Sequence, residues 1–190
     1  MAKSLALLSL LLLCTSCIQI AGLTSDYKKL DPAAHSHIST YEVGKDTLPN
    51  HFYTITGEQI RQQFEQQEKV LVYLFANGCS GPTCYPLATF KRWADENGYK
   101  IYFVATSYNN LGATYIQQLN MPLYIVNHKA YNSNMYGKYN KRFRLDLLQN
   151  EADAQALVKG NYSDLFAFEN GKLTQHTRDL LQLEPKFIQP

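Results

Sequence analysis

The sequence predicts an α/β domain built on a mixed β-sheet, because strand and helix patterns alternate along it and end in a hairpin. Residues 70–76 form a seven-residue apolar run, which is typical of a strand buried on both faces. Two more short apolar segments, 100–106 and 122–126, follow, each after a helical pattern. Asn170-Gly171 then separates two further strand patterns, and this dipeptide favours a type I′ hairpin turn. Alternating strands and helices followed by an antiparallel hairpin predict a mixed sheet.

Several segments carry helical patterns. Thr56-Gly-Glu-Gln59 matches a capping box and predicts a helix from Thr56 to about residue 67, with Ile60 and Phe64 on one face. The other expected elements are a helix over 84–96 that stops at Gly98, a short helix over 111–119, a helix or an irregular segment over 130–139 and over 152–158, and a helical tail from Asp179 that ends before Pro185.

Composition argues against a nucleic-acid partner. The chain has 190 residues, 45% of them hydrophobic, a formal net charge of +2 and an isoelectric point near 8.3. A charge this small does not indicate binding to a polyanion. A small basic cluster is interpreted as a solvated face rather than as an anion or lipid-headgroup site. Its members are Lys138, Lys141, Arg142 and Arg144.

The first residues resemble an export signal. Lys3 precedes the apolar stretch 5–13, which is too short to span a bilayer as a helix but suits the core of a signal peptide. Cys14-Thr-Ser-Cys17 resembles the lipobox of bacterial lipoproteins, although Cys14 stands where that motif usually has leucine. The resemblance implies a lipid on Cys17, whereas an ordinary secretory signal would be cleaved near Ala21-Gly22.

The expected organisation follows from these signals. Residues 1–16 are assigned to a lipoprotein signal peptide, 17–50 to a polar tether and 51–190 to the folded domain. The expected location is the cell envelope, with the lipid anchored in a membrane facing the periplasm or in the outer membrane. No internal repeat or second domain is visible in the sequence.

Cys79 and Cys84 are the two cysteines that remain as thiols in the mature chain under either cleavage, because cleavage before Cys17 removes Cys14 and lipid occupies Cys17. An exported protein is disulfide-permissive, so an even pair favours a disulfide. Residues five apart on a regular helix are separated by ~7.5 Å of rise and about 140° of rotation. A disulfide requires Cα atoms roughly 4.4–6.8 Å apart, so both cysteines cannot lie in regular helix if they pair. We therefore expect Cys79 in the turn and Cys84 in the first turn of the helix.

Three stretches carry a resemblance to thioredoxin-like proteins over about residues 51–180. They are VLVYLFANGC, GPTC and FAFENGKL, and PLYIV fits the extra strand and helix of the envelope-anchored, TlpA-type or redoxin-type branch. The resemblance implies a thiol–disulfide oxidoreductase without a cofactor, in which Cys79 is the nucleophile and Cys84 the resolving thiol. Its implied partners are protein thiols or disulfides, a reducing partner and, through the lipid, a membrane.

The chain departs from that family's pattern at three places. Its cysteines are spaced Cys-x4-Cys rather than Cys-x2-Cys, and Tyr73 stands where the family often has a buried carboxylate. Tyrosine, with a pKa of about 10, is a poor base at neutral pH. Ser163 stands where counting back from the hairpin places the family's cis-proline. A second hypothesis therefore stays open, in which the disulfide is only a local staple in a binding or structural lipoprotein.

A metal-handling protein is a third and weaker hypothesis. Copper chaperones of the same fold place a histidine shortly before the final hairpin, and residues 152–164 contain none. His128 and His176 are interpreted as surface or hydrogen-bonded histidines, and His35 and His37 as solvated residues of the tether. No metal ligand is therefore assigned.

Overall fold

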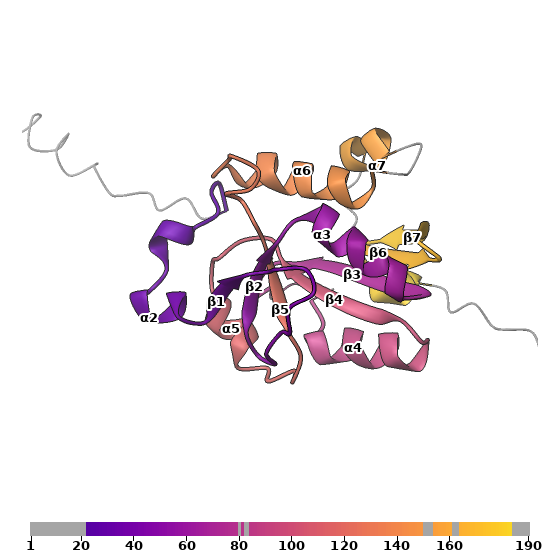
Figure 1. The fold of residues 1–190 in the computed structure, drawn as a ribbon, viewed down its shortest axis with the longest axis horizontal. Helices are drawn as coiled ribbons and strands as arrows, with labels where there is room; N and C mark the ends of the chain where they lie inside the picture. The colour runs from indigo at the N-terminus through magenta and orange to yellow at the C-terminus, as the bar shows by residue number, and fades with distance from the viewer. Residues whose placement is uncertain (1–21, 80, 82–83, 150–153, 161–163, 184–190) are drawn as a thin grey trace, which may run out of the picture.

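One mixed seven-stranded sheet with helices against both faces forms the fold (Figure 1). The structure is a computed structural model, and it describes residues 22–79, 81, 84–149, 154–160 and 164–183. The strands are β1 (Ile38–Thr40), β2 (Phe52–Ile55), β3 (Lys69–Phe75), β4 (Lys100–Ala105), β5 (Leu123–Val126), β6 (Leu165–Glu169) and β7 (Lys172–Thr177). They lie in the order β1-β2-β5-β4-β3-β6-β7. The first five in this order are parallel, whereas β6 runs antiparallel to β3 and β7 antiparallel to β6. The predicted α/β class with a mixed sheet is confirmed.

The helices form a layer on each face of the sheet. They are η1 (Tyr27–Lys29), α2 (Pro32–His35), α3 (Gly57–Gln62), η2 (Gln63–Gln66), α4 (Leu87–Glu96), α5 (Leu111–Tyr115), α6 (Tyr136–Leu147), α7 (Ala154–Gly160) and η3 (Leu180–Gln182). Helices α3, α6 and α7 pack on one face, and α4 and α5 on the other (Figure 1). Connections that cross in opposite directions along a parallel sheet place their helices on opposite faces, because the crossovers are right-handed.

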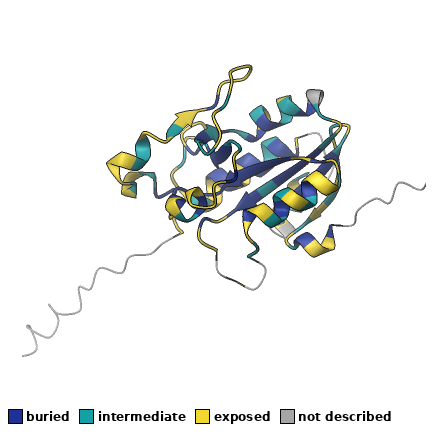
Figure 2. Ribbon diagram, turned by 90° about the horizontal axis from the view of Figure 1, so that it is seen from below, coloured by how far each residue is buried: buried dark blue, intermediate teal, exposed yellow. Residues whose placement is uncertain are grey.

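Strand β3 lies between β4 and β6 and is buried on both faces (Figure 2). Val70, Val72 and Leu74 join the core beneath α3 and α6. Leu71 and Phe75 join the opposite core beneath α4. Successive side chains of a strand point to opposite faces, so a strand covered on both sides must be apolar throughout. The prediction of a buried strand is confirmed for residues 70–75, whereas Ala76 follows the strand and is exposed.

The start of α3 agrees with the predicted capping box. The Gln59 backbone N–H donates to Thr56 Oγ1 over 3.2 Å, and the Thr56 N–H donates to Gln59 Oε1 over 2.9 Å. These two bonds satisfy donors that a helix start otherwise leaves unpaired. The helix continues as the 3₁₀ turn η2 to Gln66, close to the expected end at 67.

The next helix, α4, begins later than the sequence indicated. It starts at Leu87 with Pro86 as its N-cap, so Cys84 does not lie in the first helical turn. The expected start at residue 84 was wrong. The physical reason is that a residue preceding proline is disfavoured in helical conformation, which affects Tyr85.

Two later segments also differ from expectation. Helix α5 ends at Tyr115 rather than near 119, and Gln118 adopts a left-handed conformation with φ 46°. Of the expected segment 130–139, residues 136–139 form the first turn of α6, which runs on to Leu147, and the residues before Tyr136 are not helical. Its buried face includes Tyr139, Phe143 and Leu147, four residues apart. Of the expected segment 152–158, residues 154–158 lie in α7, and 152 and 153 are outside the described residues.

The closing hairpin is confirmed. Asn170 and Gly171 connect β6 to β7 and have φ values of 50° and 75°. Positive φ at both central residues is the signature of a type I′ turn. The expected helical tail is present as the short helix η3, which follows Asp179.

Residues 22–50, expected to form a tether, lie against the domain at several points. Strand β1 pairs in parallel with β2, and Tyr41 is buried. The backbone of Ser25 bonds both to Asn134, through its N–H, and to Tyr108, through its oxygen. Residues 1–21, which include the predicted signal peptide and the predicted lipidation site Cys17, are outside the described residues. Within the described ranges, no helix is long and apolar enough to span a membrane.

Helix α3 approaches α6 closely at Gly57. A Cβ atom at this position would overlap the Phe143 carbonyl oxygen and lie 2.7 Å from the Leu147 nitrogen. We expect Gly57→Ala to lower the free energy of unfolding by about 1–3 kcal/mol, because backbone atoms on two packed helices would have to separate. The matched control is Gly137→Ala on α6, where nothing lies within 4 Å of an added Cβ. Urea unfolding of both variants is the measurement, and equal midpoints for Gly57→Ala and wild type would contradict the close approach.

Candidate functional site

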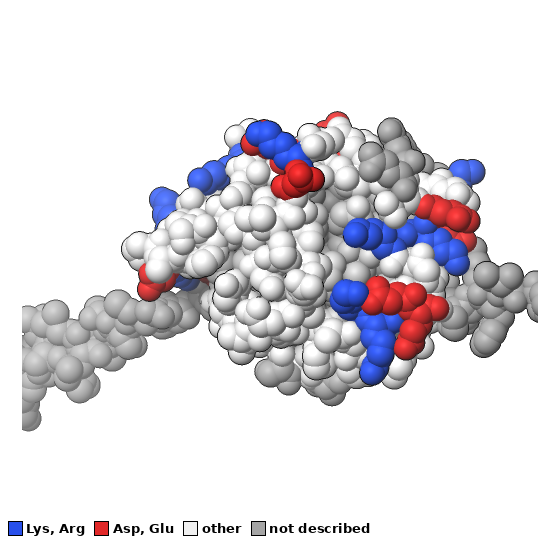
Figure 3. All heavy atoms as spheres, turned by 60° about the horizontal axis from the view of Figure 1, so that its bottom comes forward, with Lys and Arg blue, Asp and Glu red and all other residues white. Residues whose placement is uncertain are grey.

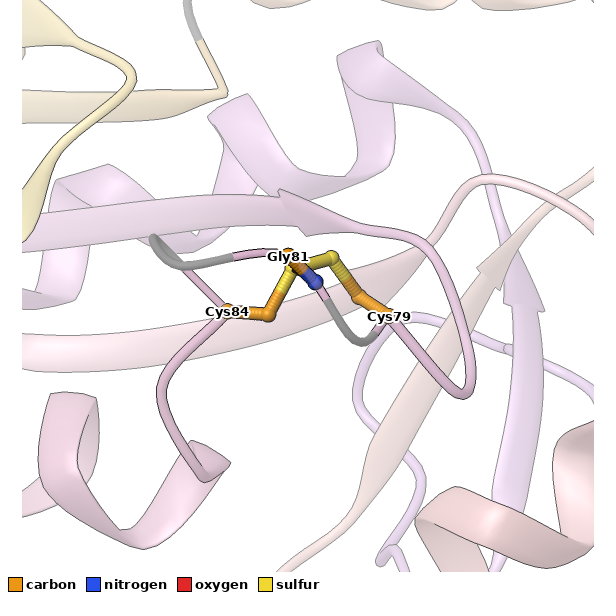
Figure 4. Close-up of a disulfide and its surroundings, with 3 residues drawn as sticks. All are labelled: Cys79, Gly81 and Cys84. Atoms are coloured by element: carbon orange, nitrogen blue, oxygen red, sulfur yellow. Dashed lines mark hydrogen bonds between the residues drawn. A yellow bond between two sulfur atoms is a disulfide. The ribbon is translucent and has the colours of Figure 1, made fainter.

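Cys79 and Cys84 form a disulfide in the loop between β3 and α4 (Figure 4). Their Cα atoms are 5.6 Å apart, within the range that a disulfide allows. The expected pairing is confirmed, and neither cysteine lies in a helix. Cys79 is exposed and Cys84 is half-buried. One end of the bridge is therefore open to solvent and the other faces the protein.

Two hydrogen bonds join Gly81 to Cys84. The Cys84 N–H donates to the Gly81 carbonyl oxygen over 3.0 Å, and the Gly81 N–H points to Cys84 Sγ at 3.1 Å (Figure 4). A hydrogen bond to a charged group stabilises the charged form. In a reduced pair of the same geometry, the Gly81 N–H would stabilise a thiolate at Cys84.

The beginning of the loop is fixed by the buried side chain of Asn77. Its Nδ2 donates to the Ser107 carbonyl oxygen over 3.0 Å, and its Oδ1 accepts from Thr114 Oγ1 over 2.6 Å. Gly78 follows with φ 67°, and a Cβ there would overlap the side chain of Asn110. The amide of Asn77 thus joins the end of β3 to the residues after β4 and to α5.

The end of the loop is held by the segment after α5. Leu87 is the first residue of α4, and its backbone N–H donates to Gln117 Oε1 over 2.9 Å. The first N–H groups of a helix lack partners within the helix, so this side chain from elsewhere in the chain caps α4. Thr114 and Gln117 are three residues apart, and one short segment therefore fixes both ends of the cysteine loop.

A pocket of about 380 Å³ lies beside the disulfide. Residues from the end of β3, from the cysteine loop and from α5 line it. Most of its lining residues are apolar or aromatic, and the pocket opens to solvent next to the bridge. The lining residues are Tyr73, Phe75, Ala76, Gly78, Cys79, Cys84, Tyr85, Pro86, Leu87, Ala113, Thr114 and Gln117.

Tyr73 forms part of the pocket wall and stacks on Phe90 of α4, with ring centroids 4.1 Å apart. Burial raises the pKa of Tyr73 to about 12, and the negative charge of Asp164 adds to the shift. The hydroxyl therefore keeps its proton at neutral pH. Tyr73 cannot replace the buried carboxylate of the thioredoxin-like pattern as a base.

Asp164 lies directly before β6, beside the end of β3. Its carbonyl oxygen accepts from the Leu74 N–H over 2.7 Å, and its carboxylate lies 3.1 Å from Arg144 Nη2. Burial raises the pKa of Asp164, and the positive charges of Arg144 and Arg178 oppose that shift. Ser163, the position counted for a cis-proline, is outside the described residues.

The predicted solvated basic face needs one correction. Lys138, Lys141 and Arg142 are exposed on α6, but the side chain of Arg144 is only 7% exposed and is paired with Asp164. Arg144 follows Asn140 by four residues, so it shares the inward face of α6 rather than the outward one. The sequence could not show this, because the partner carboxylate is twenty residues away.

The histidines do not converge on a metal site. His35 packs edge-on to Tyr27, and His37 lies near Tyr115. His128, expected at the surface or hydrogen-bonded, is instead buried between the rings of Tyr27 and Tyr108, and burial lowers its pKa. Its Nδ1 has no hydrogen-bond partner in the part of the chain that the structure describes. His176 is exposed on β7. Among the described residues, no group of three His, Cys, Asp or Glu side chains could hold a metal ion.

Comparisons of the chain with protein-family models, with curated proteins and with solved structures give no match. What the loop, the disulfide and the pocket can do chemically is therefore the basis for a functional proposal.

The raised pKa of Tyr73 predicts a specific loss of stability at high pH. An unfolded tyrosine titrates near ~10, so the folded state retains this proton where the unfolded state loses it. The resulting stability is fully present below about pH 10 and is lost as the pH rises toward the folded pKa of about 12. We expect Tyr73→Phe to lose less unfolding free energy than wild type between about pH 9 and about pH 11.5. Urea titrations at both pH values measure this, and equal losses would show that Tyr73 is not buried as described.

Proposed function

We propose that the protein is a thioredoxin-like thiol–disulfide oxidoreductase that acts through Cys79 and Cys84. The observation that carries the proposal is the placement of the bridge, with Cys79 exposed at the edge of a pocket and outside both hydrophobic cores. Another protein's thiol or disulfide can reach such a bridge. As a staple it would add little, because a loop of about six residues stabilises by only ~2 kcal/mol.

The arrangement of the chain supports the thioredoxin-like part of the proposal. A buried parallel strand, β3, leads directly into the cysteine loop and then into α4. The antiparallel hairpin β6–β7 closes the sheet beside β3, and β5 and α6 come between β4 and that hairpin. This is the order that the resemblance of the sequence implies, including the extra strand and helix.

The reaction is a pair of thiol–disulfide exchanges. In the reduced protein, the Cys79 thiolate attacks one sulfur of a substrate disulfide; the Cys79–substrate bond forms, and the other substrate sulfur leaves as a thiolate. The Cys84 thiolate then attacks Cys79 Sγ, which breaks the mixed disulfide and releases the second substrate thiol. The substrate has gained two electrons and two protons, and the protein holds the Cys79–Cys84 disulfide. A dithiol reductant restores the reduced pair by the same steps in reverse.

The exposure of the two sulfurs supports this assignment of roles. Cys79 is exposed and can meet a substrate, whereas Cys84 is half-buried and receives the Gly81 N–H. The thiolate is the reactive form of a cysteine, so a donor that stabilises it assists the resolving step. Tyr73, with its pKa near 12, takes no part as a base.

The test uses variants that interrupt the second exchange. We expect the reduced Cys84→Ser variant to form a stable adduct with bis(2-hydroxyethyl) disulfide at Cys79, because no resolving thiol is present. Mass spectrometry without reductant detects the added hydroxyethylthio group. The matched Cys79→Ser variant should react much more slowly, since its remaining thiol is half-buried.

The reduction potential of the pair distinguishes exchange from a structural role. Redox activity requires a potential above about −300 mV, where cellular dithiols can reduce the bridge. A lower potential together with no adduct on Cys84→Ser would reject the proposal. It would favour a local staple, whose reduction should lower the free energy of unfolding by ~2 kcal/mol.

We also propose that the mature chain is anchored to a membrane of the cell envelope through a lipid on Cys17. The support is the sequence around Cys14 and Cys17 alone, since these residues are outside the described ranges. We expect mass spectrometry of the mature protein to find a modified cysteine as the first residue. A mature protein that begins after Cys17 would reject the anchor and leave the proposed chemistry of Cys79 and Cys84 untouched.

A further inference from the structure

Two segments of the chain contain no charged residue. They are 70–90 and 101–127, and neither has an Asp, Glu, Lys or Arg, although such residues make up 18% of the sequence. The strands β3, β4 and β5 explain part of this, because they are buried. The loops that follow β3 and β4 are exposed in places, and exposed loops ordinarily carry charges.

The fold brings these two segments together around the disulfide. Thr114 bonds to Asn77, and Gln117 bonds to the start of α4, so α5 lies directly beside the cysteine loop. The pocket is lined by both segments, and none of its lining residues is charged or a histidine. Tyr115 and Ile116, which lie in the chain between the pocket residues Thr114 and Gln117, are also uncharged, and Ile116 is 76% exposed.

Figure 3 views the side of the molecule on which α4 and α5 lie and shows a broad uncharged area there, with the coloured charges at its margins. Lys91 and Asp95, which form an ion pair on α4, are charged residues that do not line the pocket. Three other surface hollows in the described part of the chain each include a lysine among their lining residues. The absence of charge is therefore a property of the surface around the disulfide.

An uncharged pocket selects among side chains, because a side chain that enters it must lose its hydrating water. A charged side chain would lose its hydration there without gaining a partner, whereas an apolar side chain gains free energy by burial. The centres of protein–protein interfaces are depleted in charged residues for the same reason. The negative charge of Asp164 raises the pKa of Tyr73 in the pocket wall, and Asp164 is itself paired with Arg144, whose positive charge offsets the negative one.

We infer that the substrate is a protein whose reacting cysteine is flanked by a large, uncharged apolar side chain, which enters the pocket while Cys79 exchanges with the neighbouring sulfur. The inference rests on the proposed function, because only an occupant with a thiol or disulfide makes use of the bridge at the pocket edge. The exchange itself is the one already described, with no additional reactant. The apolar side chain contributes binding and leaves the electron balance unchanged.

The test compares short blocked peptides that are joined as symmetric disulfides and differ only in the residue after cysteine, which is Leu, Glu or Lys. Reduced Cys84→Ser protein is mixed with each peptide disulfide, and the second-order rate constant of adduct formation is measured. It is divided by the rate constant for the reaction of the same peptide disulfide with free 2-mercaptoethanol. This division removes differences in the intrinsic reactivity of the peptides. We expect the Leu peptide to react at least about tenfold faster than either charged peptide, the factor that ~1.4 kcal/mol of binding free energy produces.

A charge placed in the pocket wall provides the matched variant. The variant is Ala113→Glu in the Cys84→Ser background, and its rates are compared with its rate toward bis(2-hydroxyethyl) disulfide. On this scale the Leu peptide should react more slowly than with the parent protein, and the Lys peptide should react faster. A misfolded variant would not gain a new preference, so the gain separates specificity from damage. Lys91→Glu, outside the uncharged surface, should leave the preference for Leu within about twofold.

The outcomes separate this inference from the proposed function. If bis(2-hydroxyethyl) disulfide forms no adduct, the proposed chemistry fails and the inference fails with it. If that small disulfide reacts but the three peptides react equally, or a charged peptide reacts fastest, the chemistry stands and the inferred substrate class is wrong. A Leu preference that survives Ala113→Glu unchanged would place the peptide elsewhere and would also overturn the inference.

Discussion

The burial of β3 on both faces is the constraint on which the rest of the structure depends. The strand is flanked by β4 and β6 and covered by α3 and α6 on one side and by α4 on the other. A backbone paired on both edges and packed on both faces can move little, since interiors are packed as densely as organic crystals. The loop that leaves β3 therefore starts from a fixed point, and Cys79 is four residues beyond it.

Side-chain hydrogen bonds fix the loop at its start, after β3, and at its end, where α4 begins. Asn77 is buried and bonded at both ends of its amide, and the first N–H of α4 is capped by Gln117. A buried amide without partners would cost about 1–3 kcal/mol, so these bonds specify one arrangement as well as stabilise it. Between these hydrogen bonds the loop exposes Cys79. These contacts thus hold the Cys79–Cys84 disulfide in place with Cys79 exposed at the surface.

The described residues that line the pocket beside the disulfide carry no charge. The pocket wall contains neutral Tyr73, whose proton is held by burial, and the nearest acting carboxylate, Asp164, is matched by Arg144. A proton acceptor of the kind that thioredoxin-like proteins place behind the first cysteine has no counterpart at Tyr73. The chemistry proposed for Cys79 and Cys84 then relies on thiol exchange with solvent access for protons, and the selectivity inferred for it relies on apolar contact.

The sequence alone determined those features that depend on neighbouring residues. The apolar run of β3, the capping box at Thr56 and the Asn170-Gly171 turn are local patterns, and each appears in the structure as the pattern predicts. The pairing of Cys79 with Cys84 was expected because they form an even pair, and their spacing excluded both from a regular helix if they pair. What only the tertiary structure decided are the contacts between residues that are distant in the chain: Asn77 with Thr114, Leu87 with Gln117, Arg144 with Asp164, and the assembly of two uncharged segments into one surface. No local pattern encodes such pairs, because a hydrogen bond or an ion pair across 20 to 40 residues depends on how the intervening elements pack.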